Sequence, residues 1–216
     1  MSDVAMTLVR GAAVGFAIAA PVGPVGLLCI RRTFAHGPST GLATGLGAAA
    51  ADAMYGLIAA LGVGAVASLL LEHASLLRIV GGALMALLGI AALRRARQPA
   101  GSAPAAATAP TPSGLLGAFG TTFALTASSP MTILSFAGLL AALAPPDGSV
   151  SGGLLLVAGV FSGSIAWWMM LVGGVSASRK AIPPNAIRWI EGVSGIALLA
   201  FACWSLATGI VGGAAA

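Results

Sequence analysis

Charge is scarce in this sequence, and acidic charge most of all. Asp, Glu, Lys and Arg make up 7% of its 216 residues, whereas 58% are hydrophobic and the mean hydropathy is +1.03. Soluble domains contain about 25% charged residues, so this composition excludes an ordinary soluble protein. Ten basic and five acidic residues give a net charge of +5. We attribute this charge to membrane topology and predict no nucleic-acid partner.

The residues of most enzymes and metal sites are also few. The sequence has two His, neither with a partner at metal-ligand spacing, no His-Glu-x2-His and no Gly-Lys-Ser/Thr phosphate motif. Its two cysteines, Cys29 and Cys203, form no Cys-x-x-Cys pair, and we expect each to be an apolar free thiol. We therefore predict a protein that is not an enzyme, with no cofactor and no bound metal.

What the sequence does contain is a series of long hydrophobic runs. Six of them come close to or exceed the ~20 residues that a helix needs to cross the bilayer. They are apolar on all faces, which predicts an all-α membrane protein with six transmembrane helices. The predicted spans are 11–30, 40–66, 75–93, 114–143, 152–175 and 187–211.

A Pro/Ala/Thr-rich segment divides the chain into two halves of three spans each. The predicted organisation is a first repeat over 1–94, a linker over 95–113 and a second repeat over 114–216. Because three is odd, equivalent halves must cross the membrane in opposite directions, which predicts an inverted 3+3 repeat.

Basic residues predict the orientation. Eight of the ten lie in the three connections on the linker side, so this side is predicted to be cytoplasmic and both termini to lie outside. We expect Arg31 and Arg32 to be interfacial anchors. The eight are Arg31, Arg32, Arg94, Arg95, Arg97, Arg179, Lys180 and Arg188.

Prolines interrupt the first and fourth spans at matching places. A proline removes a helical hydrogen bond and frees a carbonyl, here that of Thr126 among others. Such groups survive in a bilayer only where they are buried in protein or line a cavity, so matched breaks predict a binding site. The alternative is a pair of simple kinks with Ser and Thr bonded to their own helix. The predicted substrate-binding residues are Pro21, Gly23, Pro24, Tyr55, Thr126, Ser128, Ser129 and Pro130.

Asp52 lies within the second predicted span, where a carboxylate is costly unless it is paired, protonated or hydrated. We predict that Asp52 binds a coupling proton or a substrate ammonium group. The alternative is a structural carboxylate bonded to Tyr55 or to hydroxyls of another helix. Glu191 is expected to pair with Arg188, three residues earlier.

Weak internal matches support the repeat. Pro24 matches Pro130, and segment 47–55 aligns with segment 159–167. This alignment places Gly47, Asp52 and Tyr55 on Gly159, Ser164 and Trp167. Three Gly-x3-Gly motifs predict close helix contacts, within the protomer or in a homodimer. They begin at Gly11, Gly41 and Gly159.

These motifs also carry a family resemblance. The run 20–26, Ala-Pro-Val-Gly-Pro-Val-Gly, followed by Arg31-Arg32-Thr33-x3-Gly37-x3-Gly41 and Gly45-x-Gly47-x4-Asp52-x2-Tyr55-Gly56, resembles the first half of the LysE/RhtB amino-acid exporter superfamily. Ser129-Pro130 stands where the second half of that family has an Asn-Pro motif. The resemblance covers nearly the full length. It implies ion-driven export of an amino acid or a related zwitterion across a bacterial cytoplasmic (inner) membrane.

The sequence therefore predicts a secondary transporter, because no ATPase motif is present. Its partners would be an amino acid, a coupling proton or other ion, and the lipid bilayer. One alternative is a membrane thiol-disulfide electron carrier, which needs two cysteines near the breaks, whereas Cys203 lies in the sixth span. The other is a metal-ion exporter, for which Asp52 is the one deeply placed hard ligand.

Overall fold

The chain is described by a computed structural model, which covers residues 3–21, 23–60, 73–97, 114–129, 132, 150–178 and 184–214. In these ranges the structure is helical and contains no strand, which confirms the all-α prediction. The described helices are α1 (Asp3–Ala19), α2 (Pro24–His36), α3 (Pro38–Ala60), α5 (Ala74–Ala96), α6 (Gly114–Ala127), α8 (Val150–Ser178) and α9 (Pro184–Ala214).

Several of these helices suit a membrane by length and composition. Segments 75–94 of α5, 151–178 of α8 and 189–211 of α9 are each long and apolar enough to cross it. Helices α1 and α2 meet this test together as a bent pair, and α6 is a shorter apolar helix. The chain is thus a multi-pass membrane protein. The count of six spans stays a prediction, because 61–72 and 133–149 lie outside the described residues.

The predicted break in the first span is confirmed. Helix α1 ends at Ala19, α2 begins at Pro24, and the two axes differ by 81°. Pro24 occupies the first turn of α2, where its missing N–H costs no helical hydrogen bond. The second break is described only on one side, since α6 ends at Ala127 and Pro130 lies outside the described residues.

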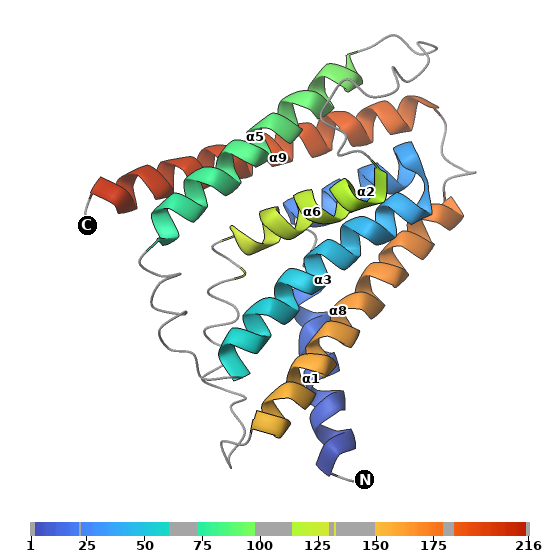
Figure 1. Cartoon of the computed structure of the whole chain (residues 1–216). Coiled ribbons are helices and arrows are strands. Elements are labelled where there is room, and N and C mark those ends of the chain that lie inside the picture. The colour runs from blue at the N-terminus through green and yellow to red at the C-terminus, as the bar shows by residue number, and fades with distance from the viewer. Residues whose placement is uncertain are drawn as a thin grey trace.

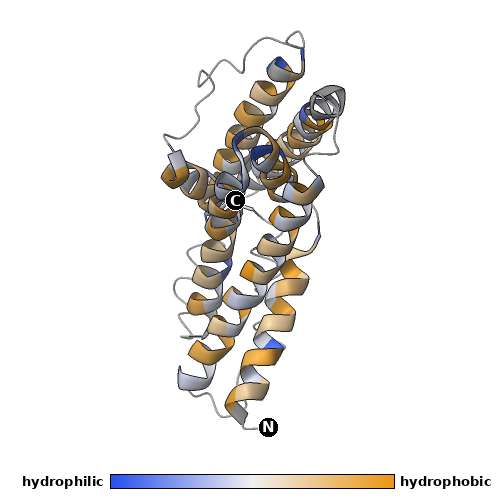
Figure 2. Cartoon of the chain, turned by 90° about the vertical axis from the view of Figure 1, so that its right-hand side faces the viewer, coloured by the Kyte–Doolittle hydropathy of each residue, from blue (hydrophilic) through white to orange (hydrophobic). Residues whose placement is uncertain are grey.

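The helices form two groups with α2 between them. Figure 1 shows α5 and α9 side by side along one edge of the bundle, crossing the group formed by α1, α3, α6 and α8. Helix α2 contacts α3, α6 and α8 of the larger group and α9 of the smaller one. Figure 2 shows hydrophobic residues along the length of the helices, with few hydrophilic ones among them.

Most helix contacts join one half of the chain to the other. Helix α1 packs on α8, α3 on α6 and on α8, and α5 on α9. The aligned glycines follow this pattern, because Gly47 lies against the α6 backbone at Phe119 and Gly159 lies against the α1 backbone at Gly11. An inverted repeat would produce these exchanged contacts, although the repeat itself stays a prediction.

Glycines bring the backbones of α1 and α8 into direct contact. A Cβ atom at Gly11 would lie 2.5 Å from the carbonyl oxygen of Leu156, and one at Gly159 would lie 2.9 Å from the Cα of Gly11. Gly15 and Gly163 lie closer still to the opposite backbone, against the carbonyl oxygens of Val160 and Ala12. Two of the predicted Gly-x3-Gly motifs thus pack within the protomer. The homodimer stays a prediction.

Candidate functional site

Asp52 is buried where α3 crosses α8. The hydroxyl of Ser164 on α8 donates a hydrogen bond of 2.9 Å to Oδ2 of Asp52, and both residues are almost completely buried. A hydroxyl on another helix is the hydrogen-bond partner expected if Asp52 is a structural carboxylate, which is the alternative to a role in transport. The bond joins the two residues that the internal alignment places at equivalent positions. It links the two halves of the chain through a single ionisable group.

Tyr55 lies one helical turn after Asp52 and contacts the end of helix α6. Its hydroxyl donates a hydrogen bond to the carbonyl oxygen of Ala127. The next residue back, Thr126, is 6% exposed, and its Oγ1 has no hydrogen-bond partner among the described residues. The end of α6 therefore offers one hydroxyl that is buried and available to a ligand.

Trp168 provides a similar group beside the first break. This residue is buried on α8, one turn after Ser164, and its Nε1 donor has no partner in the described part of the chain. It packs in a cluster with Ala19, the last residue of α1. An indole N–H can only donate, so this atom suits an acceptor such as a carboxylate.

The remaining predicted binding residues occupy the two chain breaks. Pro21 is exposed, Gly23 and Pro24 are half-buried at the start of α2, and the N–H of Gly23 donates to the carbonyl of Pro21 at 2.8 Å. Ser128 is buried, but its hydroxyl bonds to the carbonyls of Ala124 and Leu125 in its own helix. This back-bonding is what the kink alternative expected of Ser128.

One expectation about the second break is wrong. The carbonyl of Thr126 is not freed, because the N–H of Ser129 donates to it at 3.1 Å. The carbonyl that has no helical N–H partner because of the proline is therefore hydrogen-bonded within a tight turn after α6. Ser129 itself is half-buried, and Pro130 lies outside the described residues.

The start of α2 and the end of α6 lie near a common hydrophobic cluster. Val25, the second residue of α2, packs against a cluster that contains Leu28 of α2 and Leu125 of α6. Leu125 directly precedes Thr126. The start of α2 and the end of α6 thus contribute to one core, and Asp52 and Tyr55 lie on α3, which packs on both helices.

Arg31 and Arg32 are not interfacial anchors, and this prediction is wrong. Their side chains are buried, with 4% and 6% exposure. Arg31 donates to the carbonyl of Leu88 on α5 at 3.4 Å and forms an ion pair of 3.7 Å with Glu191 on α9. Glu191 thus has Arg31 as a partner, whereas the side chain of Arg188, its expected partner, lies outside the described residues.

Arg32 points to the other side of α2. Its guanidinium donates to Oγ1 of Thr44 on α3 and to three groups of α6. The α6 acceptors lie 2.8 to 3.0 Å away and are the carbonyl of Ala118 and the hydroxyls of Thr121 and Thr122. Two neighbouring arginines thus fasten α2 to four helices. Sequence analysis missed this role, although both residues belong to the motif that carries the family resemblance.

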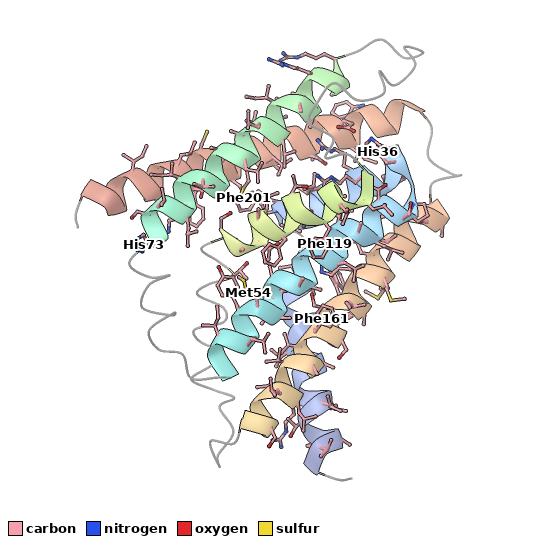
Figure 3. The ribbon with its side chains drawn as sticks, viewed as in Figure 1. His36, Met54, His73, Phe119, Phe161 and Phe201 are labelled. Carbon is pink, nitrogen blue, oxygen red and sulfur yellow. The ribbon has the colours of Figure 1, made fainter. Side chains whose placement is uncertain are left out.

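The cysteines and acidic residues give no support to the two alternative functions. Cys29 is buried in α2, Cys203 is exposed on α9, and both thiols are free. Within the described ranges no three His, Cys, Asp or Glu side chains are grouped as metal ligands would be. Figure 3 shows His36 and His73 at opposite ends of the bundle.

Comparison with known proteins identifies the family. Residues 16–209 match the LysE type translocator family. This range begins within α1, ends within α9 and includes every residue of the site described above. No curated protein and no solved structure matches the chain. The chain belongs to the LysE type translocators, a family of membrane transporters.

Proposed function

We propose that this protein is a secondary transporter that exports an amino acid or a related small zwitterion from the cytoplasm by proton-coupled alternating access. The observation that carries the proposal is the buried carboxyl group of Asp52, held across the α3–α8 contact by Ser164. An ionisable group at this depth is costly and is a functional candidate by default.

Groups on α2, α6 and α8, the helices that pack on α3, suit the two ends of a zwitterion. The indole N–H of Trp168, which has no partner among the described residues, lies beside the first break, and the N-terminus of α2 adds the positive end of a helix dipole, so both favour a carboxylate. The carboxyl group of Asp52 and the hydroxyl of Thr126, which has no partner in the described part of the chain, suit an ammonium group.

The helix contacts suit an alternating mechanism. Asp52 and Tyr55 lie on α3 and bond to α8 and α6 of the other half. Protonation of Asp52 removes the charge that Ser164 solvates, and this changes the contact between the halves. We place the protein in a bacterial cytoplasmic membrane, with the linker in the cytoplasm and the termini outside.

The test is efflux from proteoliposomes loaded with labelled threonine, leucine, lysine or arginine, with and without an imposed pH gradient. We expect release of at least one amino acid, accelerated by the gradient. Asp52→Asn should lose this acceleration while the protein stays folded. Ser162→Ala, which removes an exposed hydroxyl that bonds within α8, is the control and should behave as wild type. Absence of release for every amino acid would overturn the proposal, and a wild-type response of Asp52→Asn would remove Asp52 from it.

A further inference from the structure

The packing of α3 on α8 joins the same pairs of positions when the two halves of the chain are exchanged. The internal alignment of these helices, continued without a gap, places Gly45 on Val157 and Gly56 on Trp168. A Cβ atom at Gly45 would lie 2.5 Å from the Cβ of Trp168. One at Gly56 would lie 3.3 Å from Cγ2 of Val157. Exchange of the halves therefore converts each of these contacts into the other.

The contact between α5 and α9 has the same property. An Arg-x3-Gly motif occurs in each helix and ends at Gly82 in α5 and at Gly192 in α9. When the helices are aligned on this motif, Ala96 is equivalent to Leu206. A Cβ atom at Gly82 would lie 2.8 Å from Cγ of Leu206, and one at Gly192 would lie 3.8 Å from the Cβ of Ala96. These two contacts exchange in the same way.

Two further contacts join residues that are equivalent to each other. Asp52 and Ser164 share their hydrogen bond of 2.9 Å. A Cβ atom at Gly89 of α5 would lie 2.9 Å from Cγ of Leu199, its equivalent in α9. A twofold rotation moves every residue onto its equivalent, so equivalent residues that touch must lie beside the axis. The α3–α8 contact at Asp52 and the α5–α9 contact at Gly89 thus mark two points of one axis.

This axis passes the region where the predicted binding residues lie. Figure 1 shows α2 and α6 between the α3–α8 pair and the α5–α9 pair. In an inverted repeat the axis lies in the membrane plane, and coupling-ion sites lie near the bilayer midplane where the repeats meet. A proton on the axis is therefore held at the same depth from both faces of the membrane.

The Asp52–Ser164 pair is isolated from other titratable groups. Helices α6 and α8, which pack on α3, contain no Asp, Glu, Lys, Arg, His, Cys or Tyr. Tyr55 lies one turn along α3 itself. On α2, which also packs on α3, Arg32 bonds to Thr44, about two turns before Asp52, and Cys29 bonds to α3 about one turn earlier still. The carboxyl group is thus the one acid of this contact.

We infer that Asp52 and Ser164 form a single proton site on a twofold axis, which a carboxyl group can serve from either half of the chain. The inference rests on the proposed function, which assigns the coupling proton to Asp52. Exchange of the halves turns the pair into one with the donor on α3 and the acceptor on α8. Exchange of the two side chains should do the same, because it conserves their total volume and their hydrogen bond.

The test moves the carboxyl group across the axis. Asp52→Ser should lose the acceleration of efflux by a pH gradient in proteoliposomes loaded with an amino acid that wild type releases. Adding Ser164→Asp should restore the accelerated rate to within about tenfold of wild type. Adding Ser164→Asn instead is the matched control. Its side chain has the shape of the acid but binds no proton, so the acceleration should stay absent.

Thermal unfolding in detergent tests the geometry without transport. Ser164→Asp alone places two carboxyl groups together beside the axis and should lower the unfolding midpoint. Adding Asp52→Ser leaves one carboxyl group and one hydroxyl and should raise the midpoint again. A midpoint that falls further would show that position 164 cannot hold the carboxyl group, and it would overturn the shared site.

The outcomes separate this inference from the proposed function. If wild type is accelerated by the gradient and the folded Asp52→Ser, Ser164→Asp variant is not, the shared site is overturned and the exporter stands. Failure of that variant to fold overturns the shared site as well, because it shows that the two positions are not equivalent. Absence of release for every amino acid by wild type would overturn the exporter, and the coupling role of this site with it.

Discussion

The hydroxyl of Ser164 and the carboxyl group of Asp52 lie 2.9 Å apart, buried between α8 and α3. Hydrogen bonds to a charged group contribute about 1.5–3 kcal/mol when buried. Ser164→Ala should therefore slow gradient-driven efflux by about tenfold or more. In the Asp52→Asn background the same change should have little further effect, since the two residues act as a pair.

Initial efflux rates of the two single variants and the double variant measure this coupling. Ser162→Ala, on the same helix but exposed, should show no coupling to Asp52→Asn. Additive effects of Ser164→Ala and Asp52→Asn would mean that the hydrogen bond has no role in transport.

The glycine contact between α1 and α8 predicts a stability effect. Gly159→Ala would place a Cβ atom 2.6 Å from the carbonyl oxygen of Leu8 and 2.9 Å from the Cα of Gly11. Both are backbone atoms, so the two helices must separate, at a cost of about 1–3 kcal/mol. The thermal unfolding midpoint in detergent should fall. Gly173→Ala on the same helix has open space around its Cβ position and should not lower it. Equal midpoints for the two variants would contradict the close contact.

The ion pair of Arg31 and Glu191 predicts a non-additive effect on stability. Breaking a buried pair on one side costs about 3–5 kcal/mol, because the other charge remains buried. Arg31→Met should thus be strongly destabilising, and adding Glu191→Leu should restore much of the loss. Thermal unfolding of the two variants in detergent checks this. A double variant less stable than Arg31→Met would show that the charges themselves stabilise the fold.

The positions of the two free cysteines predict how their thiols react with a maleimide and whether their removal affects efflux. Cys29 is completely buried and Cys203, although exposed on α9, lies within its apolar segment 189–211, so neither thiol should form the thiolate that reacts with a maleimide until the protein is unfolded. Mass spectrometry of the single variants Cys29→Ala and Cys203→Ala distinguishes the sites. The double variant should retain efflux, since the proposed mechanism uses neither thiol. Loss of activity in the folded double variant would favour the electron-carrier alternative.

Sequence patterns were sufficient for the helices, the first break and the burial of Asp52, because each depends on local chemistry. Long apolar runs favour spanning helices, and Pro24 can begin a helix but cannot continue one. An acidic residue within such a run must find a polar partner, and Ser164 is that partner. The internal alignment had placed Ser164 at the position equivalent to Asp52, but an alignment cannot show that the two side chains are in contact.

The positions of Arg31 and Arg32 could not be predicted in this way. Both were expected at the interface because they follow an apolar run near a loop. The 81° bend before Pro24 redirects α2 into the bundle, and the acceptors of the arginines lie on helices 12 to 90 residues away in sequence. Such contacts depend on the tertiary arrangement. The sequence does not show which threonine hydroxyl or backbone carbonyl will accept a hydrogen bond from a distant arginine.

The exchange of contacts between the halves has a consequence for biosynthesis. Helices α1, α3 and α5 pack mainly on α8, α6 and α9, so the first half has few of its final neighbours when it leaves the ribosome. Its helices must therefore remain inserted but unassembled until the second half follows. During this time the glycine face of α1 and the carboxyl group of Asp52 are exposed to lipid. Assembly is completed only at the end of synthesis, and a chain that stops in the linker leaves a first half unable to bury its own polar groups.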